Sequence, residues 1–324
     1  MTTQSSRRYC RKTKHMALKT PLKLGTRGSP LARIQTDMVK ARLMDVFEEL
    51  RAPGMIEVVV ISTTGDQIAD RPLADIGGKG LFCKEIETAL FDGRIDAGVH
   101  SMKDMPTWLP DGLTIACMLE RADPRDALIS RKADSIKTLP EGAVVGTASL
   151  RRQAQILAKR PDLKVVNFRG SVGTRLTKLD AGEVDATLLA RAGLDRLALP
   201  DVPQSVLSPE EMLPAVGQGV IGIECREQDE KLIALFGKIG HEPSSLEVTA
   251  ERAMLDVLDG SCHTPIGAFA TIGDGRLHLR GLVARADGSE CFETERFGEP
   301  ADAVSLGRDA GQELRDRGGA DLFA

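Results

Sequence analysis

Two strand-to-helix turns carry arginines where a helix offers free N–H groups to an anion. Residues 146–152 (GTASLRR) end a predicted strand and begin a predicted helix whose first turn holds Arg151 and Arg152. Residues 169–175 (RGSVGTR) repeat the arrangement after the next strand, with an arginine at each end. Arginine opposes the helix dipole at this end, so two in succession indicate recruitment for an anionic ligand. Guanidinium groups suit carboxylates or phosphates; the alternative interpretation is a solvated basic face.

Residues 100–106 (HSMKDMP) form a polar stretch directly after a strand predicted at 95–99. Ligands of open α/β sheets bind at the carboxyl ends of strands, which makes this stretch a candidate site. Asp104 is its one carboxylate and follows Lys103. The alternative role for Asp104 is to cap the next element of a polar loop.

Cys262 lies on a predicted turn between a helix and a strand, flanked by Gly260 and Pro265. A lone cysteine is usually a small buried hydrophobe, but the polar neighbours, His263 among them, favour a reactive thiol. The six cysteines form no CxxC pair and the five histidines show no ligand spacing, so we expect reduced thiols and no metal site. Residues 77–80 (GGKG) lack the Ser or Thr of a nucleotide-binding loop and leave Lys79 as an anion contact.

The distribution of charge excludes some classes of partner. Residues 1–20 carry six basic and no acidic side chains, whereas residues 21–324 carry 37 basic and 47 acidic ones. The excess of acidic side chains in residues 21–324 should repel nucleic acid and anionic membrane surfaces. The chain also has only 3% aromatic residues, too few for a surface on which bases stack. Residues 151–196 oppose this trend with ten basic and five acidic side chains, which indicates a site for a small polyanion.

The chain shows no membrane-spanning or secretory segment. No apolar run approaches the roughly 18 residues that a membrane span requires. Residues 1–20 lack the apolar segment of a secretory signal. We expect these residues to be a disordered basic leader and the protein to be cytoplasmic; the alternative is an organelle transit peptide.

The pattern of elements predicts an α/β fold. Strands are expected at 22–25, 55–61, 95–99, 143–146, 163–168, 184–189 and 220–225, with helices at 30–50, 81–91, 150–159 and 172–180. This alternation predicts parallel sheets joined by crossover helices. The pattern then changes to a helix at 246–258, hairpin-like strands at 266–272, 277–284 and 291–297, and a last helix at 301–315. That final block predicts an α+β unit with an antiparallel sheet.

Five motifs occur in the order in which they occur in hydroxymethylbilane synthase, also called porphobilinogen deaminase. They are HSMKDMP, GTASLRRQAQ, NFRGSVGTRLTKLD, LPAVGQGVIGIECR and LDGSCHTPIGAFA. The chain resembles this family from about residue 22 to near the C-terminus. The resemblance implies two lobes like those of type II periplasmic binding proteins, with mainly parallel sheets, and a small C-terminal α+β domain. The implied domains are residues 21–119 with 218–238, residues 120–217, and residues 239–324.

The resemblance implies a transferase that joins four porphobilinogen units head to tail, releases ammonia and yields linear hydroxymethylbilane for tetrapyrrole biosynthesis. Asp104 matches the catalytic aspartate, and Cys262 matches the cysteine that holds a dipyrromethane cofactor through a thioether. The other implied cofactor-binding residues are Ser101, Lys103, Thr147, Ser149, Arg151, Arg152 and Arg169. The implied substrate-binding residues are Arg27, Ser29, Lys79, Arg169, Arg175, Arg196 and Gln218.

Some positions depart from the family's pattern without replacing Asp104 or Cys262. These are Asp75, Ala148, Ser171 and His263, which stand where lysine, serine, asparagine and glutamine are common.

The resemblance further implies a monomer whose partner is the small molecule porphobilinogen. The rival hypothesis is a non-enzymatic two-lobed binding protein for a small polyanion. An intact mass above that of the sequence by two pyrrole units distinguishes the enzyme from the binding protein.

Overall fold

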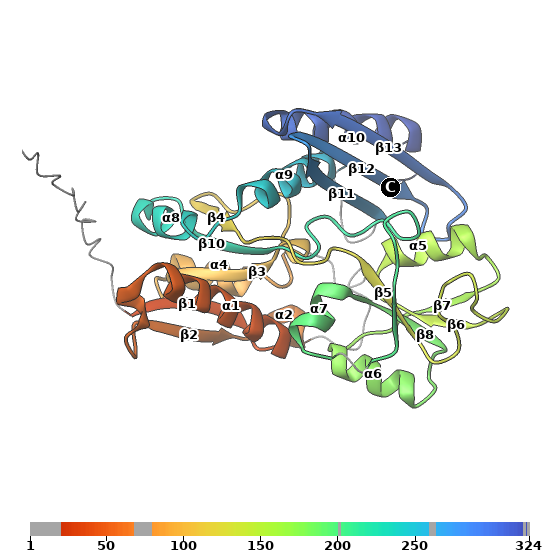
Figure 1. Cartoon of the computed structure of the whole chain (residues 1–324), viewed down its shortest axis with the longest axis horizontal. Coiled ribbons are helices and arrows are strands. Elements are labelled where there is room, and N and C mark those ends of the chain that lie inside the picture. Colours follow the sequence, from red (N-terminus) through yellow and green to blue (C-terminus); the bar gives the residue numbers. More distant parts are fainter. Residues whose placement is uncertain (1–20, 68–79, 200–201, 259–263, 320–321, 323–324) are drawn as a thin grey trace, which may run out of the picture.

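The computed structural model describes residues 21–67, 80–199, 202–258, 264–319 and 322. Within these ranges the chain forms two five-stranded sheets and one three-stranded sheet. We call the units built on them lobe 1, lobe 2 and the third domain. The lobes lie side by side in Figure 1, and the third domain lies above both.

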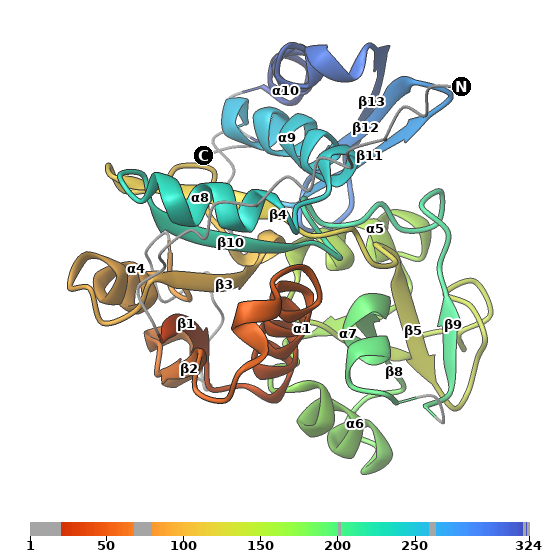
Figure 2. The same cartoon turned by 60° about the vertical axis from the view of Figure 1, so that its left-hand side comes forward.

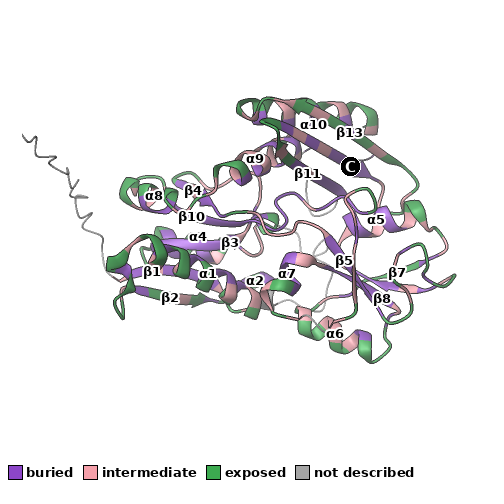
Figure 3. Cartoon of the chain, viewed as in Figure 1, coloured by how far each residue is buried: buried purple, intermediate pink, exposed green. Residues whose placement is uncertain are grey.

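Lobe 1 contains the sheet with strand order β2-β1-β3-β10-β4. Four of its strands run in one direction, and β10 runs opposite to its neighbours β3 and β4. Its strands are β1 (Leu22–Arg27), β2 (Ile56–Ile61), β3 (Ala97–Ser101), β4 (Leu113–Met118) and β10 (Ile221–Arg226). Its helices are α1 (Pro30–Val46), η1 (Glu48–Arg51), α2 (Thr64–Gln67), α4 (Lys84–Phe91), η2 (Met102–Asp104) and α8 (Glu230–Gly237). Figure 3 shows that β3 and β10, at the centre of this sheet, are mostly buried.

Lobe 2 repeats this plan with strand order β7-β6-β8-β5-β9. Here β5 is the strand that runs opposite to its neighbours, β8 and β9. Its strands are β5 (Asp126–Ser130), β6 (Val144–Gly146), β7 (Lys164–Val166), β8 (Ala186–Ala190) and β9 (Gln204–Val206). Its helices are α5 (Leu150–Lys159), α6 (Val172–Asp180) and α7 (Arg191–Arg196). Buried aliphatic residues such as Leu128, Val145, Ile156 and Leu188 form one of its cores.

The third domain is an antiparallel sheet of order β11-β12-β13 with two helices packed against it. Its elements are α9 (Glu242–Val257), β11 (Ile266–Gly273), β12 (Arg276–Ala284), β13 (Cys291–Gly298), η3 (Pro300–Asp302) and α10 (Ala303–Gly318). The two helices pack closely at Gly307 of α10. Any other residue there would place its Cβ 2.2 Å from the carbonyl oxygen of Ala250 on α9. Figure 2 shows α9 between the sheet of lobe 1 and the sheet of the third domain.

The chain passes from lobe 1 to lobe 2 between β4 and β5 and returns between β9 and β10. Each passage is followed by the one strand that runs against the rest of its sheet, β5 in lobe 2 and β10 in lobe 1. These two strands are not part of a strand-helix-strand crossover, so the rule that makes such units parallel does not apply to them.

Most predicted elements are confirmed, and α5 and α6 have the predicted bounds. The helix predicted at 30–50 is wrong at its end: it stops at Val46, because Phe47 is extended and a separate turn, η1, follows. The strand predicted at 95–99 is displaced to Ala97–Ser101, so it ends next to Met102 of η2. The sequence patterns did not identify β4, β5, β9, α7 or α8. Among the described residues, none of the helices combines the length and the hydropathy that crossing a bilayer requires.

Candidate functional site

Asp104 lies in η2, just beyond the carboxyl end of β3. The residues on either side of Lys103 and Asp104 are Met102 and Met105, which are 1% and 4% exposed and anchor the turn in an apolar cluster. Gly222 on β10 permits this packing, because a Cβ there would lie 2.2 Å from the Met102 sulfur. The two charged side chains between the methionines are therefore left exposed.

Arg27 lies at the end of β1, the parallel neighbour of β3, and so comes close to Asp104. Its Nη1 lies 3.7 Å from the Asp104 Oδ2, and its guanidinium lies over the ring of Phe82 at 3.9 Å. The Asp104 carboxylate is thus paired with one cation and is still partly accessible, with 34% of its side chain exposed.

The next predicted site residue, Ser29, caps α1 by accepting a hydrogen bond from the Ala32 amide at 3.3 Å.

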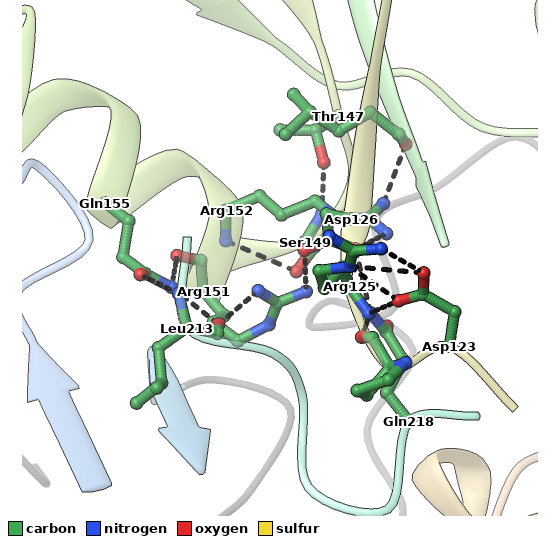
Figure 4. Close-up of polar contacts among 12 residues, drawn as sticks. Asp123, Arg125, Asp126, Thr147, Ser149, Arg151, Arg152, Gln155, Leu213 and Gln218 are labelled. Carbon is green, nitrogen blue, oxygen red and sulfur yellow. Dashed lines mark hydrogen bonds and ion pairs between the residues drawn. The ribbon is translucent and has the colours of Figure 1, made fainter. Parts of the chain in front are cut away.

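Asp126, at the start of β5, joins three of the predicted site residues (Figure 4). Its side chain is fully buried and accepts from Arg151 Nη2 at 2.8 Å, Arg152 Nη2 at 2.7 Å and Gln218 Nε2 at 2.9 Å. Burial alone would raise the pKa of Asp126, but the two arginine charges outweigh it and hold this pKa well below its usual range. The carboxylate is therefore ionised and neutralises one of the two guanidinium charges.

The interpretation of Arg151 and Arg152 as a solvated basic face is wrong, because each is only 6% exposed. Backbone carbonyls hold them in place as well: Arg151 Nη1 donates to the Leu213 oxygen at 2.6 Å and Arg152 Nη1 to the Leu188 oxygen at 2.8 Å. Contacts within lobe 2 therefore fix both side chains.

The start of α5 is capped by a hydroxyl group. Ser149 is the N-cap, and its hydroxyl accepts a hydrogen bond from the Arg152 amide at 3.4 Å. Thr147 is buried and accepts from the Ser149 amide at 3.1 Å. Both hydroxyl groups therefore order the turn that orients Arg151 and Arg152, and each retains a proton that it can donate.

Lys103 connects the charges of the two lobes. Desolvation lowers its pKa to about 8, with Asp104 opposing the shift and Arg152 adding to it, even though the side chain reaches solvent. Asp126 and Arg151 also act on its charge. Since Lys103 and Asp104 belong to lobe 1 and the other three to lobe 2, the structure brings the two candidate motifs together.

Three further predicted arginines lie on lobe 2. Arg169 follows β7, and Arg175 lies on α6 and donates Nε to the Gly170 oxygen at 3.0 Å. Burial, with the charges of Arg152 and Arg169, lowers the pKa of Arg175 to about 10. Arg196 donates Nη2 to the Gly219 oxygen at 2.7 Å, and burial lowers its pKa too. The positive charges of Arg152, Arg169 and Arg175 thus act on one another within lobe 2.

The Nε–H groups of Arg151, Arg152 and Arg196 are buried and meet no hydrogen-bond acceptor among the residues that the structure describes. A buried donor without a partner costs about 1–3 kcal/mol, and native proteins leave few of them. Together with the excess of positive charge, these donors fit a ligand that carries carboxylates.

The remaining predicted residues divide into two groups. Ser101 is the last residue of β3 and is half-buried beside η2. Lys79, Asp75, Cys262 and His263 lie outside the described residues. The sequence analysis missed Asp126, although an aspartate at the start of the apolar run DALIS was a usable signal, since a buried carboxylate needs a partner.

Two cavities lie away from these charged groups. One, of about 220 Å³, is lined mainly by apolar residues of lobe 2 such as Leu176 and Val202. The other, of about 130 Å³, lies between α5 and the strands β12 and β13. In the described part of the chain there is also no cluster of three or more His, Cys, Asp or Glu side chains that suits a metal ion. The groups around Asp104 and Asp126 therefore remain the candidate site.

Comparisons with known proteins agree along almost the whole chain. A family model described as porphobilinogen deaminase, dipyromethane cofactor binding domain, matches residues 22–234, and one described as porphobilinogen deaminase, C-terminal domain, matches residues 245–316. The chain is 54% identical over 306 residues to the chloroplastic porphobilinogen deaminase of Oryza sativa subsp. japonica, covering 93% of this chain and 85% of that one. It is 52% identical over 303 residues to the porphobilinogen deaminase of Paracoccus denitrificans, covering 94% and 96%. Among solved structures, the periplasmic aliphatic sulphonate binding protein SsuA of Escherichia coli matches with a TM-score of 0.42 and 17% identity, over 72% of this chain and 69% of that one.

Proposed function

The chain belongs to the porphobilinogen deaminase family and is an enzyme of the transferase class, and we propose that it performs the family's reaction with Asp104 as its catalytic carboxylate. In that reaction four porphobilinogen units join head to tail and ammonia is released, which gives linear hydroxymethylbilane for tetrapyrrole biosynthesis. The alternative of a non-enzymatic binding protein is not favoured, because the matching relatives and both family models are deaminases.

The gathering of basic side chains from both lobes carries this proposal. Each porphobilinogen has an acetate and a propionate, so the growing chain gains two carboxylates at every addition. Arg151 and Arg152 each offer a buried, unpartnered Nε–H, and Asp126 neutralises only one of their charges. The charges of Arg151, Arg152 and Asp126 also act on Lys103 of lobe 1. A polycarboxylate between the lobes supplies the acceptors and the negative charge that these residues lack.

Asp104 has the charge and the accessibility that the bond-forming step requires. In each addition the aminomethyl carbon of porphobilinogen loses ammonia, which leaves with the bonding electrons, and a cationic pyrrole remains. The α-carbon of the preceding pyrrole forms the new bond, and the proton it loses converts the ammonia to ammonium. The Asp104 carboxylate stabilises the cation, accepts hydrogen bonds from pyrrole N–H groups and holds the proton in transit. At about 4 Å and an effective dielectric of about 20, one such contact is worth roughly 4 kcal/mol before desolvation.

The residues present fit a dipyrromethane cofactor, which is a tetracarboxylate. We propose that Cys262 holds it through a thioether and that its carboxylates contact Arg151, Arg152 and Lys103. Ser101, Thr147, Ser149 and Arg169 complete the proposed set of contacts. When bound, the cofactor supplies the free pyrrole α-carbon on which the product is built. Arg27, Ser29, Lys79, Arg175, Arg196 and Gln218 are the proposed contacts to the incoming porphobilinogen and the growing chain. Within the protein, Gln218 also donates a hydrogen bond to Asp126, and Ser29 also caps α1.

We propose the domain division of the sequence analysis: residues 21–119 with 218–238, residues 120–217, and residues 239–324. The position of β10 between β3 and β4 supports assigning the returning segment to the first domain. We further propose a cytoplasmic monomer without metal, nucleic-acid or membrane partners. The alternative location is an organelle, reached through residues 1–20 as a transit peptide, and cell fractionation with an antibody distinguishes the two.

The test supplies the purified protein with porphobilinogen and measures ammonia, hydroxymethylbilane and the intact mass of the protein. We expect turnover and a mass above that of the 34.9 kDa chain by two pyrrole units. An unmodified mass and no turnover, in protein from cells that make porphobilinogen, would contradict the proposal.

A further inference from the structure

The segment that follows Asp104 forms no regular secondary structure, and its carbonyl oxygens are held by one side chain of the third domain. Arg252 of α9 donates Nη1 to the Met105 oxygen at 3.3 Å. Its Nη2 donates to the Pro106 oxygen at 2.6 Å and to the Thr107 oxygen at 3.1 Å. Backbone carbonyls away from water must find donors, and the planar fork of arginine can serve several at once.

An apolar contact reinforces this connection. Val248 lies one helical turn before Arg252 on the same face of α9. It belongs to the same buried cluster as Met102 and Met105, the two anchors of the turn that carries Lys103 and Asp104. The turn is therefore packed against α9 on its apolar side and bonded to α9 along its backbone.

The same helix is fixed to the two segments that connect the lobes. Glu251, next to Arg252, is fully buried and accepts from Arg121 Nη1 at 2.6 Å in the first connection. It also accepts from the Gly217 amide at 2.7 Å in the second connection and from the Ala270 amide at 2.8 Å in β11. Since α9 ends at Val257, it leads in sequence towards Cys262. One helix thus joins the Asp104 turn to both connections between the lobes.

We propose that Arg252 is a positioning residue for the reaction: it holds the backbone at residues 105–107, and through it Asp104, in a fixed relation to α9. This inference rests on the proposed function, because it assigns Arg252 a part in the step that Asp104 catalyses. The consequence is that the Asp104 turn keeps a fixed relation to α9 and, through Glu251, to the two segments that connect the lobes. A displacement of about 1 Å in a reacting group can cost about a hundredfold in rate, which sets the scale of the effect.

The experiment compares Arg252→Gln and Arg252→Lys with a matched control, Arg160→Gln. Arg160 likewise binds three backbone oxygens through one side chain, those of Ile136, Lys137 and Leu139, but it does so in lobe 2. Trp108 is the single tryptophan of the chain, 48% exposed, and directly follows the bonded carbonyl of Thr107, so its fluorescence reports on this segment. The second measurement is the single-turnover rate of porphobilinogen addition to cofactor-loaded protein.

We expect Arg252→Gln to shift the Trp108 emission and to slow single-turnover addition about ten- to a hundredfold, with little change in the concentration of porphobilinogen that gives half-saturation. Arg252→Lys should recover most of the rate, because an ammonium group can still donate to these carbonyls. Arg160→Gln should leave emission and rate unchanged.

Wild-type emission and rate in Arg252→Gln, or a shifted emission with a wild-type rate, would overturn the inference and leave the proposed function standing. Equal slowing in Arg160→Gln would also overturn it, since the effect would then be one of general stability. No turnover by the wild-type protein would refute the proposed function itself, so the two failures are distinguishable.

Discussion

Replacing Asp126 by asparagine keeps the shape of the side chain and removes the charge that holds two arginines. In the protein three donors, from Arg151, Arg152 and Gln218, converge on its two oxygens at 2.7–2.9 Å. Asparagine has one acceptor oxygen, so its NH₂ group would face a donor, and two guanidinium groups would remain buried without a counter-charge. Breaking a buried ion pair by removing one partner costs about 3–5 kcal/mol, and we expect Asp126→Asn to lower the free energy of unfolding by that amount.

The same argument predicts a dependence on pH. The folded protein holds the pKa of Asp126 below its usual range, whereas the unfolded chain has the ordinary value of about 3.9. The contribution of this carboxylate is therefore complete above about pH 5 and is lost progressively as the pH falls below about 4. In Asp126→Asn this part of the acid destabilisation should be missing.

Urea unfolding, followed by far-ultraviolet circular dichroism between pH 3 and pH 8, measures both effects. Asp123→Asn is the matched control, since Asp123 lies three positions before Asp126 and also pairs with an arginine. Its Oδ2 lies 2.6 Å from Nη2 of Arg125, but the side chain of that arginine is 43% exposed. An exposed pair of this kind contributes about 0–1 kcal/mol. Adding Arg152→Gln to Asp126→Asn removes one uncompensated charge and should recover part of the loss. A loss in Asp126→Asn no larger than in Asp123→Asn would refute the reasoning.

Three further predictions concern the reaction. Asp104→Asn should slow single-turnover addition of porphobilinogen by two to three orders of magnitude, the equivalent of about 3–4 kcal/mol. Asp104→Glu should retain more activity, and a near wild-type rate in Asp104→Asn would mean that the residue has a structural role. Lys103, whose pKa is lowered to about 8, should lose its charge as the pH rises through that value, which weakens its proposed contact to the cofactor carboxylates. The rate of single-turnover addition should therefore fall above about pH 8 in the wild type but not in Lys103→Arg, and identical pH–rate profiles would contradict this. Cys262→Ala should abolish the added mass of two pyrrole units while Cys291→Ala, which alters an exposed cysteine, keeps it, and peptide mapping that finds the adduct elsewhere would exclude Cys262.

Local patterns were enough to predict those features that depend on neighbouring residues. The starts of α1 and α5 were predicted at residues 30 and 150, and the structure shows that Ser29 and Ser149 cap them through bonds between residues three positions apart. The bounds of α5 follow from its amphipathic spacing. The motif around Asp104 was placed correctly at a strand end.

Features that depend on distant residues could not be predicted in this way. Asp126 meets Gln218 across 92 positions, and Arg252 meets Pro106 across 146, so no local spacing records either contact. The orientation of β5 and β10 likewise depends on how the chain passes between the lobes. The first-turn arginines indicated an anion, but only the folded structure shows that their first anion is a carboxylate of the protein itself.

The place of β10 between β3 and β4 fixes an order of assembly during synthesis on the ribosome. All five strands of lobe 2 come from one continuous stretch, residues 126–206, and are translated before residues 221–226. Until β10 emerges, β4 has no partner strand in its sheet and one edge of β3 is open. The sheet of lobe 2 can therefore be completed before that of lobe 1, and the open edge of β3, with its unpaired N–H and C=O groups, is what a nascent chain must keep from pairing with other polypeptides.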